Sequence, residues 1–342
     1  MGHDELESGI AALAAEIEPA SQAYGEALRA RASGGASAAD AENIELAARL
    51  AAAQHAALPR LGARCIVVCA GDHGIATDGG VRVDSELGLL ADRDTPTRAV
   101  LRQVAVGPSA LGTAAYAASA ALVLVDCGMR GDDAIEGVLD LRIGAGTADI
   151  RRGAAMSRDQ AAASVRTGMA LLVSLAENGL DVLGVGQVAV GARAASSAVI
   201  AALAGVPADT VGQADREGVA AALAANRVDP ADPLALLAAL GGFEIGVLAG
   251  VMLAAASLRI PVVLDDHGTA AAALLAARWQ PAVAGYLIAA HPGTTPGHRQ
   301  VLRALGLVPL YGQAVSHGEG TGAAMALPLL EHAVQRSTQA LP

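Results

Sequence analysis

The stretch CIVVCAGDHG, residues 65–74, joins a short uncharged apolar run to a polar turn that is rich in glycine. A short apolar run bounded by turn residues is typical of a strand buried on both faces of a parallel sheet. Long alanine-rich stretches with helical periodicity separate such runs, so we expect right-handed helical crossovers between parallel strands. Four more runs repeat the pattern along the chain: 121–126, 182–185, 261–264 and 285–289.

Helix boundaries are marked at several places between these runs. Ser157 and Gln160 form a capping box before a helical stretch that Gly179 ends, and Ser37 is a second helix start. The two ends of the chain carry helical patterns without strands. We therefore expect a mostly parallel, doubly wound (Rossmann-like) α/β sheet in residues 61–322. A small helical domain is expected to form from both termini, residues 1–60 and about 323–342.

The composition limits what the core and any anion site are made of. Hydrophobic residues make up 53% of the 342 residues and aromatic ones only 2%, so small aliphatic side chains must fill the core, with glycine allowing close approach. All 23 basic residues are arginine. An anion site must therefore use arginine, backbone N–H groups or helix N-termini.

Charge and hydropathy argue against several partners. The net charge is −11 and no basic cluster occurs, which argues against nucleic acid. The longest uncharged apolar stretch within 239–264 is 245–258, short of the roughly 20 residues of a membrane span. The acidic N-terminus lacks the order of a signal peptide, so we expect a cytoplasmic protein without a membrane partner. The three cysteines suggest neither a zinc site nor a disulfide framework, and we expect them to be small buried residues.

Polar, glycine-rich loops follow the predicted strands. In open parallel sheets, ligands bind outside the carboxyl ends of the strands, so these loops are expected to meet at one crevice. The aspartates and histidines in them have plainer explanations, since an aspartate can cap a helix and a histidine can satisfy buried backbone groups. The loops are residues 71–74, 186–191, 265–269 and 291–295, together with the turn 317–322.

Glu319 stands out in the last turn because glycines flank it, just before a long apolar helix. Glycine near a helix start is costly, and it is best explained by close approach of a ligand or of another backbone. A helix N-terminus normally lowers the pKa of a carboxyl group. If Glu319 is a general base, it therefore needs partial burial to raise its pKa again.

Taken together, the loops and their flanking segments resemble one family, the nicotinate-nucleotide–dimethylbenzimidazole phosphoribosyltransferases. The matching segments follow the family's order and span roughly residues 60–335. They are VVCAGDHGIA (67–76), GTADIRRGAAMS (146–157), GGFEIGVLAGVMLAAA (241–256), PVVLDD (261–266), AHPGTTPGHRQVLRALGLVPL (290–310) and HGEGTGAAMALPLL (317–330).

The resemblance implies a homodimeric enzyme of cobalamin lower-ligand assembly that needs neither cofactor nor metal. Such an enzyme moves the 5-phosphoribosyl group from nicotinate mononucleotide to an aromatic base such as 5,6-dimethylbenzimidazole, which gives alpha-ribazole 5'-phosphate and nicotinate. Glu319 would be the general base that accepts the azole proton. The implied substrate-binding residues are Asp72, His73, Gly186, Gln187, Arg193, Asp265, His291, Gly318, Gly320 and Thr321.

Several positions depart from the family pattern. Gln187 replaces an acid, and Arg193 falls where the family has Asn-Thr-Thr. Near residues 209–219 neither the Gly-Thr-Gly turn nor the phosphate-binding lysine is present, and Arg216 is a possible substitute. Residues 80–85 lack the proline and glutamine of the azole pocket, and Asp-Asp-His at 265–267 replaces Asp-Gly-Phe.

These departures leave three alternatives open. The first is a paralogue with a different acceptor, and the second is a non-catalytic binding or regulatory subunit of an active homologue. The third is a metal-dependent hydrolase using Asp72, His73, Asp265, Asp266 and His267, because such side chains suit divalent metals.

Overall fold

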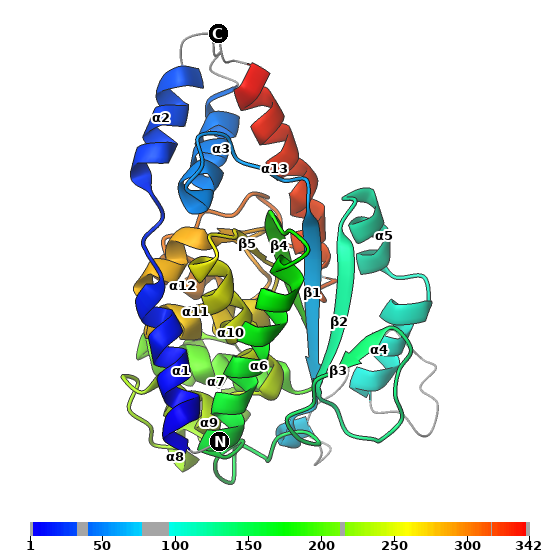
Figure 1. Ribbon diagram of the computed structural model, residues 1–342. Helices are drawn as coiled ribbons and strands as arrows, with labels where there is room; N and C mark the ends of the chain where they lie inside the picture. The colour runs from blue at the N-terminus through cyan, green and yellow to red at the C-terminus, as the bar shows by residue number, and fades with distance from the viewer. Residues whose placement is uncertain (1–2, 33–39, 77–95, 213–215, 316, 340–342) are drawn as a thin grey trace.

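The computed structural model describes residues 3–32, 40–76, 96–212, 216–315 and 317–339. In this part of the chain, six strands form one parallel sheet in the order β3-β2-β1-β4-β5-β6 (Figure 1). The order reverses between β1 and β4, as in doubly wound dinucleotide-binding folds, which confirms the predicted fold class. The strands are β1 (Arg64–Gly71), β2 (Ala121–Gly128), β3 (Val138–Asp140), β4 (Val182–Val188), β5 (Val262–Leu264) and β6 (Leu287–Ala289).

All five predicted apolar runs contain strands, and one strand was missed. β6 begins two residues later than predicted because a 3-10 helix, η4 (Pro281–Tyr286), occupies the start of that run. The missed strand, β3, has only three residues and pairs with β2 alone at the sheet edge. Such a short and largely exposed edge strand carries no buried apolar run for a sequence pattern to detect.

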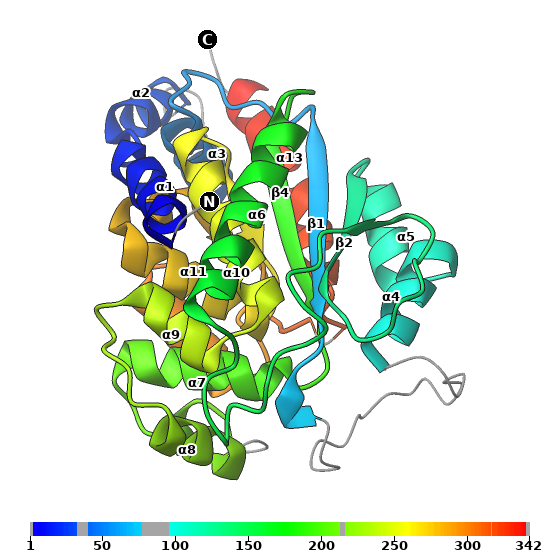
Figure 2. The ribbon, with the colours of Figure 1, turned by 60° about the horizontal axis from the view of Figure 1, so that its bottom comes forward.

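Helices cover both faces of the sheet (Figure 2). Along β1, Cys65, Val67 and Cys69 belong to one hydrophobic core, and the alternate residues Ile66 and Val68 belong to another. This alternation places one helical layer on each face. The first face packs against α6 (Arg158–Ala176), α10 (Phe243–Ser257) and α11 (His267–Trp279); the second packs against α4 (Pro96–Val106), α5 (Ala110–Ala117) and α13 (Thr321–Gln339).

Close helix packing explains how a chain poor in aromatic residues builds its core. A Cβ atom on Gly168 of α6 would overlap the carbonyl oxygen of Val247, and one on Gly250 of α10 would overlap that of Val165. The two helices can therefore approach to backbone contact only because both positions are glycine. The capping box predicted at the start of α6 is present.

Three helices from the two ends of the chain form a small cluster above the sheet (Figure 1). Leu28 of α2 (Gln22–Ala32) and Ile44 of α3 (Ala41–Gln54) are buried there, with Val334 of α13 packed against them. By contrast, α1 (His3–Glu16) packs on α6 and α10. The division into two domains stays a prediction, and the helix start predicted at Ser37 lies outside the described residues.

In the described part of the chain, no helix is both long and apolar enough to cross a membrane.

The other elements complete the fold. The remaining elements are η2 (Gly74–Ala76), α7 (Ala192–Ala204), η3 (Ala208–Thr210), α8 (Arg216–Ala225), α9 (Pro233–Leu240) and α12 (Pro296–Ala304).

Candidate active site

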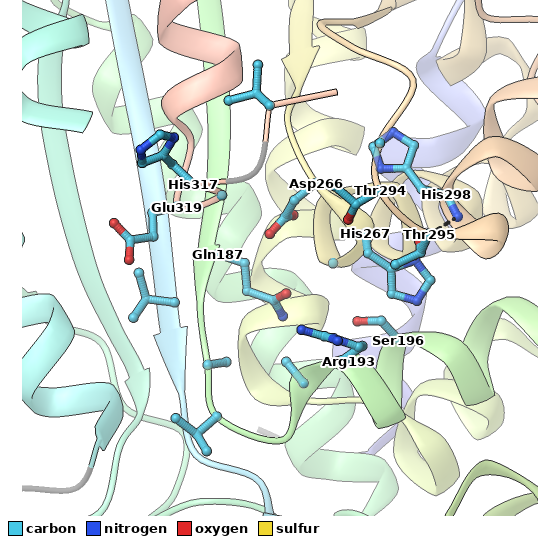
Figure 3. Close-up of a pocket in the computed structure, with 18 of the residues that line it drawn as sticks. Gln187, Arg193, Ser196, Asp266, His267, Thr294, Thr295, His298, His317 and Glu319 are labelled. Atoms are coloured by element: carbon cyan, nitrogen blue, oxygen red, sulfur yellow. Dashed lines mark hydrogen bonds between the residues drawn. The ribbon is translucent and has the colours of Figure 1, made fainter. Parts of the chain in front are cut away.

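A cavity of about 380 Å³ opens at the carboxyl ends of β4, β5 and β6. The loops that follow these strands line it, together with the turn before α13 and two residues of α4. Five of the predicted site residues lie on this pocket: Gln187, Arg193, His291, Gly318 and Glu319. In Figure 3, Glu319 and His317 lie on one side of the pocket, and Arg193, Ser196 and His267 lie on the other.

The turn that carries Glu319 has an unusual backbone. Gly318, Glu319 and Gly320 have φ angles of 64°, 62° and 97°, three successive residues in the left-handed region. A glutamate there costs free energy that the surrounding structure must offset. A Cβ atom on Gly186 of β4 would overlap the carbonyl oxygen of Glu319 and the amide nitrogen of Gly320. The close approach expected at this turn is therefore to another backbone, that of β4.

The environment of Glu319 suits a proton acceptor. Burial, and then the negative charges of Asp265 and Asp266, raise the pKa of Glu319 to about 7. A carboxyl group with this pKa accepts a proton near neutral pH more readily than an ordinary surface glutamate, which is a much weaker base. The partial burial that a general base at this position needs is present.

Asp265 does not line the pocket but lies directly beneath the Glu319 turn. Its side chain is fully buried, and Oδ2 accepts a hydrogen bond of 2.7 Å from the backbone N–H of Gly320. Its Oδ1 lies 3.1 Å from Nε2 of His291. The next residue, Asp266, lines the pocket and caps α11 through a capping box with Thr269.

Gln187 connects the pocket to a buried glutamate that sequence reasoning missed. Its side-chain amide donates a 2.8 Å hydrogen bond to Oε1 of Glu244, and Nε2 of His73 lies 2.7 Å from the same oxygen. Burial raises the pKa of Glu244, but the charge and hydrogen bond of His73, aided by Gln187, outweigh burial and hold the pKa below its usual value. Glu244 lies within the matched segment 241–256, where its position two residues after the Gly241-Gly242 pair was the available signal.

The loop after β1, residues 71–74, does not line the pocket, contrary to the expectation that all the polar loops meet there. Asp72 accepts a 2.7 Å hydrogen bond from the backbone N–H of Arg130, and His73 is buried against Glu244. The geometry gives no support to substrate contacts by these two residues, so that role stays a prediction. In the described part of the chain, no three His, Cys, Asp or Glu side chains gather in a way that could hold a metal ion, which leaves the metal-dependent hydrolase without structural support.

Three further predicted site residues, Thr321, Gly186 and Gly320, do not line the pocket. Thr321 is buried and faces a second cavity of about 530 Å³ between α5 and α13. Gly186 and Gly320 lie against each other beneath the pocket. The predicted azole-pocket segment, residues 80–85, lies outside the described residues.

The side of the pocket opposite Glu319 has the features of an anion site. Three helices begin there: α7 at Ala192, α11 at His267 and α12 at Pro296. The positive ends of their dipoles attract anions, although the first N–H groups of α12 already have partners within the protein. Arg193, in the first turn of α7, adds a full positive charge.

Two polar atoms on that side have no hydrogen-bond partner in the described part of the chain. They are Oγ of Ser196 and Nε2 of His298, and both residues are buried and line the pocket. Burial, and then the charge of Arg193, lower the pKa of His267 to about 4; burial is also the main cause that lowers the pKa of His298 to about 3. Both rings are therefore neutral at pH 7. Both nitrogens of His267 already have hydroxyl partners, at 2.9 and 3.0 Å, so only Nε2 of His298 remains to bind a ligand.

Sequence reasoning missed several lining residues for different reasons. Ser196 lies one helical turn after Arg193, so helical spacing is the signal that could have found it. His298 follows the helix-capping Thr295 by three residues. Thr97 and Val100 come from α4, where no local pattern marks them as part of a site.

Comparison with known proteins gives the same family over nearly the whole chain. A sequence model of the family described as Phosphoribosyltransferase matches residues 17–340. The nicotinate-nucleotide–dimethylbenzimidazole phosphoribosyltransferase of Roseiflexus sp. (strain RS-1) is 39% identical over 287 residues, 80% of this chain and 79% of that protein. The protein of the same name from Desulforudis audaxviator (strain MP104C) is 38% identical over 283 residues, 79% of this chain and 78% of that protein.

A solved structure agrees with these sequence matches. The crystal structure of this phosphoribosyltransferase from Thermus thermophilus superposes with a TM-score of 0.84 at 32% identity, covering 93% of this chain and 96% of that chain. The match therefore extends over nearly the whole of both chains. The chain belongs to the nicotinate-nucleotide–dimethylbenzimidazole phosphoribosyltransferase family.

Proposed function

We propose that this protein transfers the 5-phosphoribosyl group of nicotinate mononucleotide to an aromatic base such as 5,6-dimethylbenzimidazole. The products are alpha-ribazole 5'-phosphate and nicotinate, as cobalamin lower-ligand assembly requires. The observation that carries the proposal is a pocket with a carboxyl group of pKa about 7 on one side and an anion site on the other. Family membership supports the reaction type.

Glu319 is the general base of the proposed reaction. Its carboxylate accepts the N–H proton of the azole, and the ring nitrogen attacks the anomeric carbon of the ribose. The bond from that carbon to the pyridine nitrogen breaks, and its electron pair leaves with nicotinate. Attack from the face opposite the leaving group inverts the anomeric carbon and gives the alpha product. The reaction needs no covalent intermediate, because positioning and proton removal supply the catalysis.

The 5'-phosphate of the donor is proposed to bind on the side of Arg193. The guanidinium supplies the positive charge that a lysine would otherwise supply, and the starts of α7, α11 and α12 supply the positive ends of their helix dipoles. The unpartnered hydroxyl of Ser196 is a further donor. Because the chain contains no lysine, this arrangement accounts for phosphate binding with the groups that it has.

The pocket lining also suits a flat apolar acceptor. It includes four valines, Val100, Val188, Val190 and Val315, whose small side chains leave room for a ring. Gln187, which replaces the acid of the family pattern, also lines this space. A different aromatic acceptor is therefore the second candidate, and it shares the donor, the base and the mechanism.

A homodimer and a cytoplasmic location are also part of the proposal. Exposed apolar side chains on α4 and α5 support association of two copies, since Val106 is 67% exposed and Tyr116 is 88% exposed. Light scattering after gel filtration is expected to give twice the mass of one chain. A mass equal to one chain would contradict the homodimer.

The test of the reaction is incubation with nicotinate mononucleotide and a panel of benzimidazoles, purines and phenols. Liquid chromatography with mass detection follows both nicotinate and the new nucleotide. We expect both to appear with at least one acceptor, and neither to appear with Glu319→Gln above the uncatalysed level. Product with other acceptors but none with 5,6-dimethylbenzimidazole would identify the paralogue. No nicotinate release from folded protein with any acceptor would favour the non-catalytic subunit.

A further inference from the structure

Asp265 links the turn of Glu319 to the loop that follows β6. The sheet register pairs Leu264 with Ala289, so the residues just beyond these two strand ends meet. Oδ2 of Asp265 accepts the backbone N–H of Gly320 at 2.7 Å, and Oδ1 lies 3.1 Å from Nε2 of His291. One buried carboxylate thus contacts two of the loops that line the pocket.

The hydrogen bonds of His291 fix which nitrogen carries the proton. The backbone N–H of Gly293 donates to Nδ1 of His291 at 3.0 Å, so Nδ1 must be the acceptor. In the neutral ring the proton is then on Nε2, which donates it to Asp265. The result is a continuous chain of hydrogen bonds from Gly293, through His291 and Asp265, to Gly320.

The turn of Glu319 needs such an anchor. Its three left-handed residues, one of them a glutamate, persist only where neighbouring groups determine the backbone. Below the turn, a Cβ atom on Gly322 would overlap Oδ1 of Asp265 and the ring of His291, so the first turn of α13 rests directly on this pair. The anchor and the start of α13 therefore form one packed unit.

We infer that Asp265, oriented by His291, is a positioning residue that holds the carboxylate of Glu319 over the pocket and joins the two sides of the site. The kinetic test of this inference rests on the proposed function, because it measures the proposed transfer reaction. Asp265 makes no contact with the pocket, so it acts through the Gly320 amide and not on the substrate. Its negative charge also contributes to the raised pKa of Glu319.

Charged and titratable groups near Glu319, besides Asp265, also bear on a pH test of this inference. Asp266, from the start of α11, raises the pKa of Glu319 in the same direction as Asp265. Gln187, from β4, is neutral. The remaining charged or titratable groups that line the pocket are Arg193 of α7, His267 of α11, His291 of the loop after β6, His298 of α12 and His317 of the same turn.

The test compares Asp265→Asn with the wild type. An asparagine oxygen can still accept the Gly320 N–H, but its NH₂ group then faces the N–H of His291, and the chain of hydrogen bonds breaks. We expect kcat to fall roughly 10- to 100-fold, as for small misplacements of a catalytic group, while KM for the donor changes little. Loss of one negative charge lowers the pKa of Glu319, so the acid limb of the kcat profile shifts below its wild-type position near pH 7.

Asp181→Asn is the matched control. Asp181 also accepts a backbone N–H, that of Ala63 at 2.9 Å, but at the opposite end of the sheet. We expect its kcat and acid limb to match those of the wild type. The inference would be overturned if Asp265→Asn kept wild-type kcat, or lost activity only in proportion to folded protein with an unmoved acid limb. An inactive wild type would instead count against the proposed function.

A measurement on the wild type tests the anchor without any variant. In NMR hydrogen exchange on glycine-labelled protein, the amide of Gly320 should exchange far more slowly than that of Gly312, which is exposed. Equal exchange rates would show that the hydrogen bond to Asp265 does not hold the turn. This result does not depend on activity, so it applies even if Asp265→Asn fails to fold.

Discussion

Gly186 and Glu319 touch through their backbones, since a Cβ atom on Gly186 would overlap the carbonyl oxygen of Glu319. The central strand β4 thereby supports the turn that carries the proposed base. A methyl group added at residue 186 should therefore displace the turn and, with it, the carboxylate of Glu319. Gly186 does not line the pocket, but its lack of a side chain leaves the space that the Glu319 turn occupies.

Gly186→Ala is expected to lower kcat roughly 10- to 100-fold, because the turn must move to admit the methyl group. The matched control is Gly184→Ala on the same strand and face. A Cβ atom there meets side-chain atoms only, Ile66 Cγ1 at 3.2 Å and Ala323 Cβ at 3.3 Å, which can shift slightly. Steady-state kinetics and thermal melting of both variants check the prediction. Equal kcat values would refute the backbone contact as the cause.

Glu319→Gln is expected to raise stability at alkaline pH while it abolishes base catalysis. The folded-state pKa of about 7 exceeds the ordinary glutamate value of 4.5, so the folded protein holds this proton more tightly than the unfolded chain does. The free energy of unfolding therefore falls as the pH rises from 4.5 to about 7, and it stays lower above pH 7. Relative to the wild type, we expect Glu319→Gln to gain roughly 1–3 kcal/mol at pH 8 and nothing below about pH 4.5. The lower figure applies because solvent screens a partly exposed carboxylate.

Urea denaturation at several pH values measures this difference. Glu331→Gln, in the same helix α13, is the control of opposite sign, because the hydrogen bond from Arg64 is the main cause that lowers the pKa of Glu331. We expect that variant to gain no stability at pH 8. If Glu319→Gln also gained none, the carboxylate would not be buried among repelling charges in solution.

Arg193→Ala is expected to raise KM for nicotinate mononucleotide with little change in kcat. A charge-assisted hydrogen bond contributes about 1.5–3 kcal/mol, which corresponds to a rise of roughly 10- to 100-fold. Higher salt should raise the wild-type KM and leave that of the variant less affected. Arg216→Ala is the control, since Arg216 is exposed at the start of α8 and does not line the pocket. A larger effect at Arg216 would reverse the assignment.

The sequence was sufficient for the parts of the fold that local patterns encode. The central strands β1 and β4 each contain a short apolar run, and the start of α6 has its own capping box, so these elements follow from short segments. The position of Glu319 on a tight turn was also predictable, because glycines flank it on both sides. The β3 strand was not, since three residues at an edge carry too little pattern.

The remaining parts of the site depend on contacts between distant segments. Thr97 lines the pocket only because α4 packs beside β4, where its hydroxyl accepts the N–H of Val190 at 3.1 Å. Asp265 and His291 form a pair only because β5 and β6 are neighbours in register. Glu244 reaches Gln187 from the start of a buried helix, 57 residues along the chain. No single segment contains the information for such contacts.

Gln187→Glu is expected to make stability depend on pH, because it places a second carboxylate at the 2.8 Å contact with buried Glu244. Two buried carboxylates this close cannot both ionise, so one pKa rises above its unfolded value. Stability is then retained at low pH and lost as the pH rises through that raised pKa, by on the order of 1–3 kcal/mol at pH 8. The double variant Gln187→Glu with Glu244→Gln restores one carboxylate and one amide, so it should recover most of this loss in urea denaturation. Equal stability of Gln187→Glu at pH 5 and pH 8, relative to the wild type, would contradict the contact.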